Sequence, residues 1–218
     1  MRGDFIDAIR SNQQAFGLTL ATRIIEALAD YFELVLKNNT LLHLVAPCTP
    51  EEFAVRHTLE SLAMLEFVPT GARFADVGTG AGLPAIPCLL AREDLRAVLI
   101  ESKEKKAAFL SKAVEELDIS SRCEVGNRQF DEVRTRDFEF VSCRALDKFI
   151  ERLPRLLRWT DKRTFLFFGG PSLGEALKRQ HALFKSRLLP MSEQRFLYVG
   201  QPARKEQRQF DAQTAFSK

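Results

Sequence analysis

The segment from Asp76 to Pro84 constrains the fold most, because it places three glycines in a GxGxG spacing between two apolar stretches. Residues 74–77 have the composition of a short buried strand, and residues 86–91 are predicted to continue as a helix. A glycine turn between a strand and a helix lets a ligand approach the backbone closely. A plain tight turn of an α/β protein is the alternative, and the turn alone does not decide between the two.

The chain beyond this turn alternates between short apolar strands and amphipathic helices. Strands are predicted at 97–101, 122–125, 138–142 and 164–168, with helices at 105–117 and 149–157. Alternation at this spacing specifies right-handed βαβ units and a parallel sheet. Residues 195–199 are a candidate for an additional edge strand, antiparallel to the others.

The first 70 residues are predicted to form a helical cap on this core. Helices are expected at 5–9 and at 20–36, the second capped by Thr19 and ended by Asn38, Asn39 and Thr40. Thr49 and Pro50, followed by two glutamates, predict the start of another helix that runs to Leu65. We therefore expect one domain over 1–218, with the cap at 1–70 and the α/β core at 71–218.

Composition narrows the class of protein further. With 218 residues, 45% hydrophobic and 28% charged, the chain is long and apolar enough for a packed core, which excludes a disordered chain, collagen and a disulfide miniprotein. No apolar stretch approaches the roughly 18 residues that span a bilayer. The four cysteines include no CxxC pair, so no metal site is expected. We expect a cytoplasmic protein that does not enter a membrane.

Positive charge is concentrated in the second half of the chain. Residues 144–208 hold 15 Lys or Arg against 6 Asp or Glu, an excess of +9, while the net charge of the whole chain is +3. A one-sided basic region is expected of a protein with a polyanionic partner such as nucleic acid. A solvated helical face explains such a distribution equally well.

The residues around the glycine turn indicate which ligand it suits. A dinucleotide fingerprint requires glycine at position 83, where this chain has Leu83, so a tightly held pyrophosphate is disfavoured. Glu101 is the last residue of the second predicted strand, where a carboxylate can accept both hydroxyls of a ribose; an ordinary exposed glutamate is the alternative. The turn, Glu101 and Asp76 together resemble the S-adenosylmethionine site of the Rossmann-like class I methyltransferases.

A closer resemblance covers roughly residues 20–170. The octapeptide 55–62 (VRHTLESL), the turn 76–87 (DVGTGAGLPAIP) and the segment 99–110, which starts LIES, occur in the order and spacing of one family. The tripeptide 143–145 (CRA) resembles that family's serine-arginine-alanine. The chain thus resembles the RsmG/GidB family of bacterial 16S rRNA (guanine-N7)-methyltransferases.

The resemblance implies an α/β fold with a mostly parallel twisted sheet, helices on both faces and a helical N-terminal extension. It implies S-adenosyl-L-methionine as cofactor, and 16S rRNA or the small ribosomal subunit as partner of a monomer. The expected cofactor-binding residues are Asp76, Gly78, Thr79, Gly80, Gly82, Leu83, Glu101, Ser102, Gln129, Phe130 and Arg144. The expected RNA-binding residues are Arg56, His57, Lys105, Lys106, Arg128, Arg155 and Arg158.

Several of these positions have alternatives. Arg56 and His57 are candidates for a helix-to-sheet hydrogen bond that fixes the cap, and Arg128 for an ion pair with Asp131. The chain also departs from the family pattern at Ala81, at Glu101, at Gln129 and Phe130, at His43-Leu44-Val45 and at Phe168. The departures at His43 and Phe168 replace an asparagine and a lysine, which reduces the polar groups expected around the RNA base.

The resemblance implies methylation of guanine N7 in the decoding-site (530) loop of 16S rRNA. Guanine N7 carries a lone pair and no proton, so it attacks the methyl group directly and needs no general base. Catalysis then consists of positioning, and His57 and Arg144 are the residues expected nearest the acceptor base. The alternatives are a methyltransferase of the same fold that acts on another RNA, a protein or a small molecule, and a non-catalytic nucleotide-binding regulator.

Overall fold

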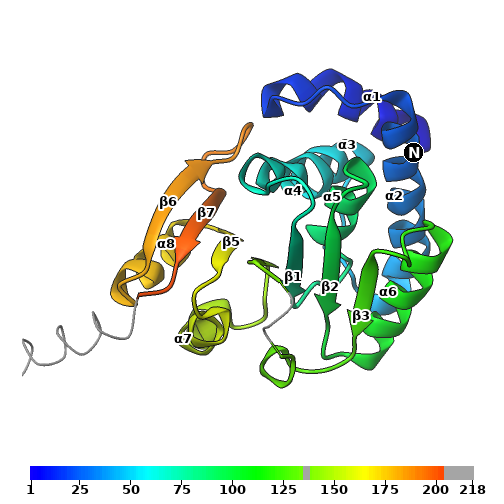
Figure 1. Ribbon diagram of the computed structural model, residues 1–218. Helices are drawn as coiled ribbons and strands as arrows, with labels where there is room; N and C mark the ends of the chain where they lie inside the picture. The colour runs from blue at the N-terminus through cyan, green and yellow to red at the C-terminus, as the bar shows by residue number, and fades with distance from the viewer. Residues whose placement is uncertain (135–137, 204–218) are drawn as a thin grey trace, which may run out of the picture.

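The computed structural model describes residues 1–134 and 138–203, and its centre is a seven-stranded sheet in the order β3-β2-β1-β4-β5-β7-β6 (Figure 1). The strands are β1 (Arg73–Val77), β2 (Arg96–Ile100), β3 (Cys123–Gly126), β4 (Phe140–Arg144), β5 (Thr164–Gly169), β6 (Leu183–Leu188) and β7 (Phe196–Gln201). Strands β1 to β5 pair in parallel, while β7 is antiparallel to β5 and to β6. The predicted parallel core is confirmed.

Helices cover both faces of the sheet, as expected. Phe165 and Phe167 of β5 belong to one hydrophobic cluster, which includes α7 (Phe149–Thr160) and α8 (Pro171–Arg179). The alternate residues Leu166 and Phe168 belong to the other cluster, together with the N-terminal helices. Because successive side chains of a strand point to opposite faces, this continuous apolar strand contributes to both cores.

The second face is covered by the N-terminal segments, which lie together with α5 and α6 in Figure 1. These elements are α1 (Arg2–Asn12), η1 (Gln13–Phe16), α2 (Thr22–Leu42), α3 (Pro50–Glu52), η2 (Phe53–Leu59), α4 (Glu60–Leu62) and η3 (Ala63–Phe67), with α5 (Ala85–Ala91) and α6 (Glu104–Glu116). A short helix, η4 (Phe130–Glu132), follows β3. The predicted helical N-terminus is therefore present.

The helical run that begins at Pro50 follows its sequence signal closely. The Thr49 side chain accepts a hydrogen bond from the Glu52 backbone, and the Glu52 side chain accepts one from the Thr49 backbone, which completes a capping box. The run continues without a break, but Phe53–Leu59 is π-helical and the last turn, which ends at Phe67, is a 3-10 helix. π-Helical turns occur frequently at functional sites.

The predicted bounds of the long N-terminal helix are wrong. Helix α2 starts at Thr22 after Ala21, without a side-chain cap, so Thr19 is not its cap. It also passes through Asn38 and Asn39, whose amides donate to the carbonyls of Leu34 and Val45. These bonds satisfy the polar side chains inside the helical path, and the helix ends only where His43 adopts a left-handed conformation at φ 47°.

The prediction of an edge strand at 195–199 is half right. Strand β7 is antiparallel, but it lies inside the sheet, between β5 and β6, and β6 forms the edge. The sequence analysis missed β6 because it is mostly exposed and carries Lys185 and Arg187 among its apolar residues. It also missed α8, which starts after Gly170-Pro171 and contains Gly174.

Candidate functional site

The glycine turn lies where β1 ends, between β1 and α5, and the sheet order reverses here because β1 pairs with both β2 and β4. Ligands of open α/β sheets bind at such a switch point. Gly78, Gly80 and Gly82 have positive φ angles of 66°, 57° and 96°, which L side chains rarely adopt. The turn is tied down on two sides. The Gly78 amide donates to the Ile100 carbonyl at 2.9 Å, and the buried Tyr31 hydroxyl donates to the Ala81 carbonyl at 3.0 Å.

The three glycines differ in the space around them. A Cβ at Gly82 would lie 2.4 Å from Ile86 Cδ1, and one at Gly78 would lie 2.5 Å from Leu146 Cδ1. A Cβ at Gly80 would meet nothing closer than the Gly78 carbonyl at 3.9 Å. Gly82 therefore permits close packing against α5, whereas the position above Gly80 is open to a ligand.

Glu101 follows the last residue of β2 and is 6% exposed. Its Oε2 accepts a hydrogen bond from the Gly80 amide at 3.1 Å, and its Oε1 accepts one from the Lys103 amide at 2.8 Å. The alternative of an ordinary exposed glutamate is therefore wrong. A carboxylate has about four lone-pair sites, so Glu101 retains capacity for further donors such as ribose hydroxyls.

Asp76 is fully buried below the turn. Its Oδ1 accepts a hydrogen bond from the Ser142 hydroxyl of β4 at 2.7 Å, whereas its Oδ2 and the nearby Thr79 Oγ1 are buried without a hydrogen-bond partner. Burial raises the pKa of Asp76 to about 7. This carboxyl group therefore titrates near neutral pH, and it connects the turn to β4.

A buried three-way ion pair lies at the end of β4. Glu60 is 0% exposed, and its two carboxylate oxygens contact Arg144 Nη2 at 3.1 Å and Arg195 Nε at 2.6 Å. Arg144 also donates to the Arg56 carbonyl at 2.6 Å, while its Nη1 is buried without a partner. Burial lowers the pKa of Arg144. The Arg144 guanidinium lies 5.6 Å from the ring centre of Phe168, the position at which the family often has lysine.

His57 lies on the π-helical segment η2, one turn before Glu60. Its Nδ1 is buried without a hydrogen-bond partner, and its ring meets the Phe53 ring edge-on at 5.1 Å. Burial, together with the positive charges of the nearby arginines, Arg144 first, lowers the pKa of His57 to about 4. His57 is therefore neutral at pH 7. The alternative suggested for Arg56 and His57, a hydrogen bond between this helix and the sheet, is present: Arg144 of β4 donates to the Arg56 carbonyl.

The residues predicted at the adenine end of the site lie in two environments. Ser102 and Gln129 are exposed, and the Gln129 backbone caps η4 through Glu132. Phe130 is buried, and its ring packs edge-on against Trp159 of α7 at 5.6 Å. The contacts of Phe130 thus serve the core below α7, and its predicted contact with adenine stays a prediction.

The predicted RNA-binding cations are mostly exposed. Lys105, Arg128, Arg155 and Arg158 are on the surface, and Lys106 donates to the His43 carbonyl at 3.0 Å. Asp131, the proposed partner of Arg128, forms its ion pair with Arg155.

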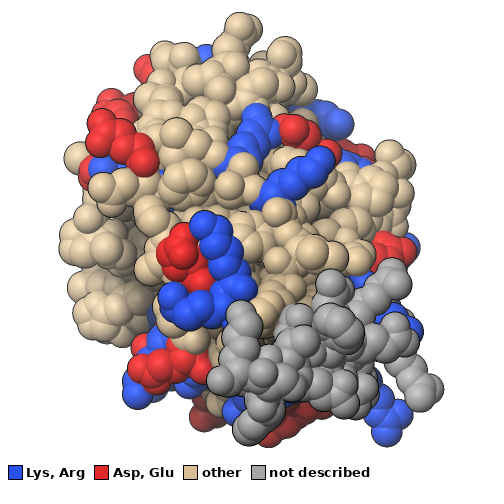
Figure 2. Space-filling model, turned by 90° about the vertical axis from the view of Figure 1, so that its left-hand side faces the viewer, with Lys and Arg blue, Asp and Glu red and all other residues tan. Residues whose placement is uncertain are grey.

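Many cations of the basic region, residues 144–208, form ion pairs with acidic residues of the same chain. Within 144–203, the paired cations are Arg144 and Arg195 with Glu60, Arg155 with Asp131, Arg163 with Asp161, Lys178 with Glu175, and Arg187 with Glu66. Figure 2 shows basic side chains interspersed with acidic and uncharged ones on the face that it presents. The excess of positive charge is therefore partly neutralised.

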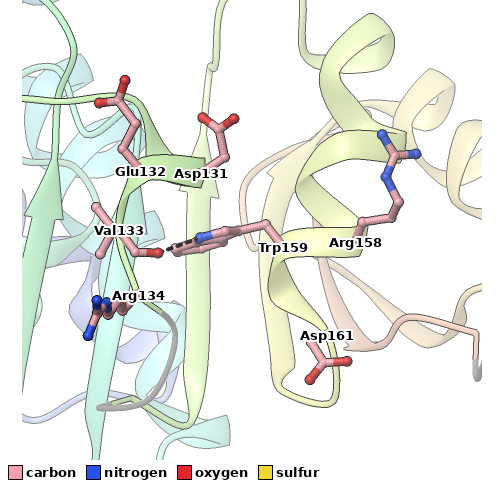
Figure 3. Close-up of a pocket in the computed structure, with 7 residues that line it drawn as sticks. All are labelled: Asp131, Glu132, Val133, Arg134, Arg158, Trp159 and Asp161. Atoms are coloured by element: carbon pink, nitrogen blue, oxygen red, sulfur yellow. Dashed lines mark hydrogen bonds between the residues drawn. The ribbon is translucent and has the colours of Figure 1, made fainter.

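Two surface cavities of the described residues lie near the predicted RNA-binding residues, and the lining of these two includes no residue predicted to bind the cofactor. The first, of about 530 Å³, is lined by Asp131–Arg134 and by Arg158, Trp159 and Asp161 of α7 and its end (Figure 3). Trp159 crosses it and donates to the Val133 carbonyl at 3.0 Å. The second, of about 650 Å³, lies between Glu51–Arg56 and the turn Met191–Arg195.

Sequence analysis missed three residues that shape the site, namely Tyr31, Glu60 and Arg195. Glu60 alone carried a signal, because it is a carboxylate between Leu59 and Leu62 in a predicted helix that packs on the core. No helix of the described residues is long and apolar enough to cross a membrane. Within the same residues, no three His, Cys, Asp or Glu side chains gather as a metal site.

The strand order, the glycine turn and the acid after β2 define a Rossmann-like methyltransferase fold. A protein of the NADB-Rossmann superfamily from Streptococcus agalactiae is 17% identical with a TM-score of 0.56, and the match covers 67% of this chain and 69% of that one. The B. subtilis tRNA methyltransferase TrmK is 13% identical with a TM-score of 0.53, with 68% of each chain covered. These structures share the fold.

The family follows from the sequence comparisons. The model of the GidB family, described as rRNA small subunit methyltransferase G, matches residues 24–188, and this chain belongs to that family. Two curated relatives are named ribosomal RNA small subunit methyltransferase G. The one from Sorangium cellulosum is 35% identical over 64% of this chain and 61% of its own length; the one from Nitrosospira multiformis is 41% identical over 59% of each. The chain thus spans about three fifths of these relatives.

Proposed function

We propose that the protein is an S-adenosylmethionine-dependent methyltransferase that modifies guanine N7 in the decoding-site (530) loop of 16S rRNA. Membership of the family supports methylation of small-subunit rRNA. The observation that carries the proposal is Glu101, whose buried carboxylate follows β2 and is bonded to the open glycine turn at Gly80. The base, the atom and the loop are those implied by the family resemblance.

The residues present fit the cofactor. Glu101 has free lone pairs for two ribose hydroxyls, and Gly80 leaves the space above the turn open. Gly78, Leu83 and the exposed Ser102 and Gln129 would complete its surroundings. S-adenosylmethionine supplies an electrophilic methyl group on a sulfonium. The protein then has to hold the acceptor base in line with that group.

A neutral His57 and a fixed Arg144 suit an acceptor atom that carries no proton. Guanine N7 loses no proton on methylation, so a residue near it need not act as a base. The guanine ring becomes positively charged, and a neutral His57 adds no repulsion at pH 7. Arg144 is held by Glu60 and by the Arg56 carbonyl, which makes it a rigid contact for the RNA.

Methyl transfer to RNA tests the proposal directly. Small ribosomal subunits and naked 16S rRNA would be incubated with labelled cofactor, and reduction followed by aniline cleavage would locate N7-methylguanine. We expect one strong cleavage in the decoding-site loop. Label on another base, another RNA or a protein would contradict the acceptor, and no label on any acceptor would favour the non-catalytic regulator.

Glu101→Ala tests the cofactor site. A hydrogen bond to a charged group contributes about 1.5–3 kcal/mol, so we expect cofactor affinity to fall at least tenfold by calorimetry. Glu101→Asp, which restores the usual residue of the family, should retain binding, and Glu104→Ala, an exposed acid on α6, serves as the control. Equal affinity of Glu101→Ala and the parent protein would place the ribose elsewhere.

A further inference from the structure

The second cavity lies at the same edge of the sheet as the predicted site, and we call it the hairpin groove. One wall is formed by Glu51, Val55 and Arg56, and the other by the turn Met191–Arg195 between β6 and β7. Phe196, the first residue of β7, pairs with Gly169, the last residue of β5. The turn before β7 therefore lies at the carboxyl edge of the parallel strands, where ligands bind in this class of fold.

Buried charges join this groove to the predicted acceptor site. Arg195 lines the groove and contacts Glu60, which also holds Arg144 at the end of β4. Arg56 lines the groove as well, and its carbonyl accepts from Arg144. Arginines of the groove and of the site are thus fixed relative to each other by one buried carboxylate and one carbonyl.

Three buried polar atoms without hydrogen-bond partners lie close to Arg56 and Glu60. Arg144 Nη1 and His57 Nδ1 are both buried and make no hydrogen bond, and so is Thr58 Oγ1 on the same π-helical segment. Buried polar atoms without partners are rare in folded proteins, and each calls for an explanation. None of the three residues lines the groove, so they mark the predicted acceptor site beside it and not the groove itself.

The lining of the groove suits a nucleobase better than a bare phosphate chain. It offers a side-chain amide in Gln194, carboxylates in Glu51, Glu52 and Glu193, and an apolar surface at Val55 and at Met191, which is 57% exposed. Its two arginines are paired, Arg56 with Glu52 and Arg195 with Glu60. A base has donors and acceptors on its edges and two apolar faces. These carboxylates would repel a phosphate, whereas each paired arginine keeps further N–H donors for the acceptor atoms of a base.

We infer that the hairpin groove receives an unpaired nucleotide of the acceptor RNA, next to the base that is methylated. This inference rests on the proposed function and deepens it. Its volume of about 650 Å³ lies within the roughly 300–1,000 Å³ of small-ligand sites. Single-stranded loops are the usual targets of specific RNA recognition, because their bases can be splayed into protein pockets.

Photo-crosslinking from the groove tests the inference. A benzophenone amino acid would replace Met191 in the whole chain, and small ribosomal subunits with cofactor would be irradiated and sequenced. The same amino acid at Leu183, which is 63% exposed on β6, is the matched control. We expect a crosslink from position 191 to RNA within a few nucleotides of the methylated guanine, and none there from position 183.

The outcomes separate this inference from the proposed function. If the guanine is methylated in the same reaction but position 191 crosslinks to a ribosomal protein, to distant RNA or to nothing, the groove has been misassigned. If no RNA is methylated, the proposed function fails first, and the groove inference falls with it. Equal crosslinking from both positions also overturns the groove inference.

Kinetics give a second measurement on the folded protein. Met191→Ala and Gln194→Ala remove apolar surface and a donor from the groove without touching the Glu60 ion pairs. We expect each to raise KM for RNA about fivefold, with kcat and cofactor affinity unchanged, because the lost contacts bind the ground state and transition state alike. Leu183→Ala should leave all three unchanged. A fall in kcat without a change in KM would overturn the inference.

Discussion

Asp76→Asn should change how the stability of the protein depends on pH. Burial raises the pKa of Asp76 from 3.8 to about 7, a shift of about three units. Because the folded protein holds this proton more tightly than the unfolded chain does, the group costs stability as pH rises from about 4 to about 7. At about 1.4 kcal/mol per unit, the full cost above pH 7 is about 4 kcal/mol.

The variant lacks the titrating group, so the comparison with the parent protein isolates it. The free energy of unfolding would be measured by urea denaturation between pH 4 and pH 8 for the parent and for Asp76→Asn. We expect the variant to gain about 4 kcal/mol relative to the parent across this range, on top of a pH-independent offset from its altered hydrogen bonds with Ser142. Leu183→Ala, which involves no titratable side chain, should differ from the parent by a constant amount.

A constant difference between Asp76→Asn and the parent from pH 4 to pH 8 would refute the reasoning. It would mean that water or a hydrogen bond stabilises the charged carboxylate at a position where the structure leaves Oδ2 without a partner. Ser142→Ala offers a second check. It removes the 2.7 Å hydrogen bond to Oδ1, which favours the charged form, and should steepen the loss of stability with pH.

Three further predictions concern other parts of the site. His57→Gln should gain about 3 kcal/mol relative to the parent as pH falls from about 6.5 to about 4, because the unfolded chain protonates this histidine below about pH 6.5 while the folded protein keeps it neutral down to about pH 4; a flat difference in urea titrations would contradict this. Glu60→Ala should lower the free energy of unfolding by about 3–5 kcal/mol, since it leaves Arg144 buried without its counter-charge, and a loss under about 1 kcal/mol would exclude that role. In thermal unfolding, Gly80→Ala should cost about 1–2 kcal/mol for its left-handed backbone alone, and Gly82→Ala clearly more, because its Cβ would lie 2.4 Å from a side-chain carbon; equal losses would count against the crowding.

The central strands were predictable because buried strands consist of consecutive apolar residues, and this pattern is visible in the sequence. Parallel strands that are covered on both faces are apolar throughout, as in Phe165–Phe168, and so they are distinguishable from amphipathic helices. The capping box at Thr49 is a local signal of the same kind, and the structure contains it. Strand β6 has no such signal, because its pairing with β7 rather than its own burial makes it a strand.

The glycine turn and Glu101 were also predictable, since both lie at fixed places in a βαβ unit. The ion pairs of Glu60 were not, because Arg144 and Arg195 follow it by 84 and 135 residues and meet it only through the fold. Phe130 has a packing contact that the sequence analysis did not predict. Its position in the chain suggested an adenine contact, and its ring packs against Trp159.

The titratable groups at the end of β4 and on η2 carry little net charge. Glu60 is shared by two arginines, which leaves the cluster one positive charge to set against the RNA. His57 is neutral at pH 7, and burial favours the neutral form of Asp76. In the proposed reaction a positive charge moves from sulfur to the guanine ring and no net charge is created. With His57 neutral and only one net positive charge on the Glu60 cluster, these groups give that transfer no electrostatic assistance, and the contribution of the site to the rate comes from holding the base in line.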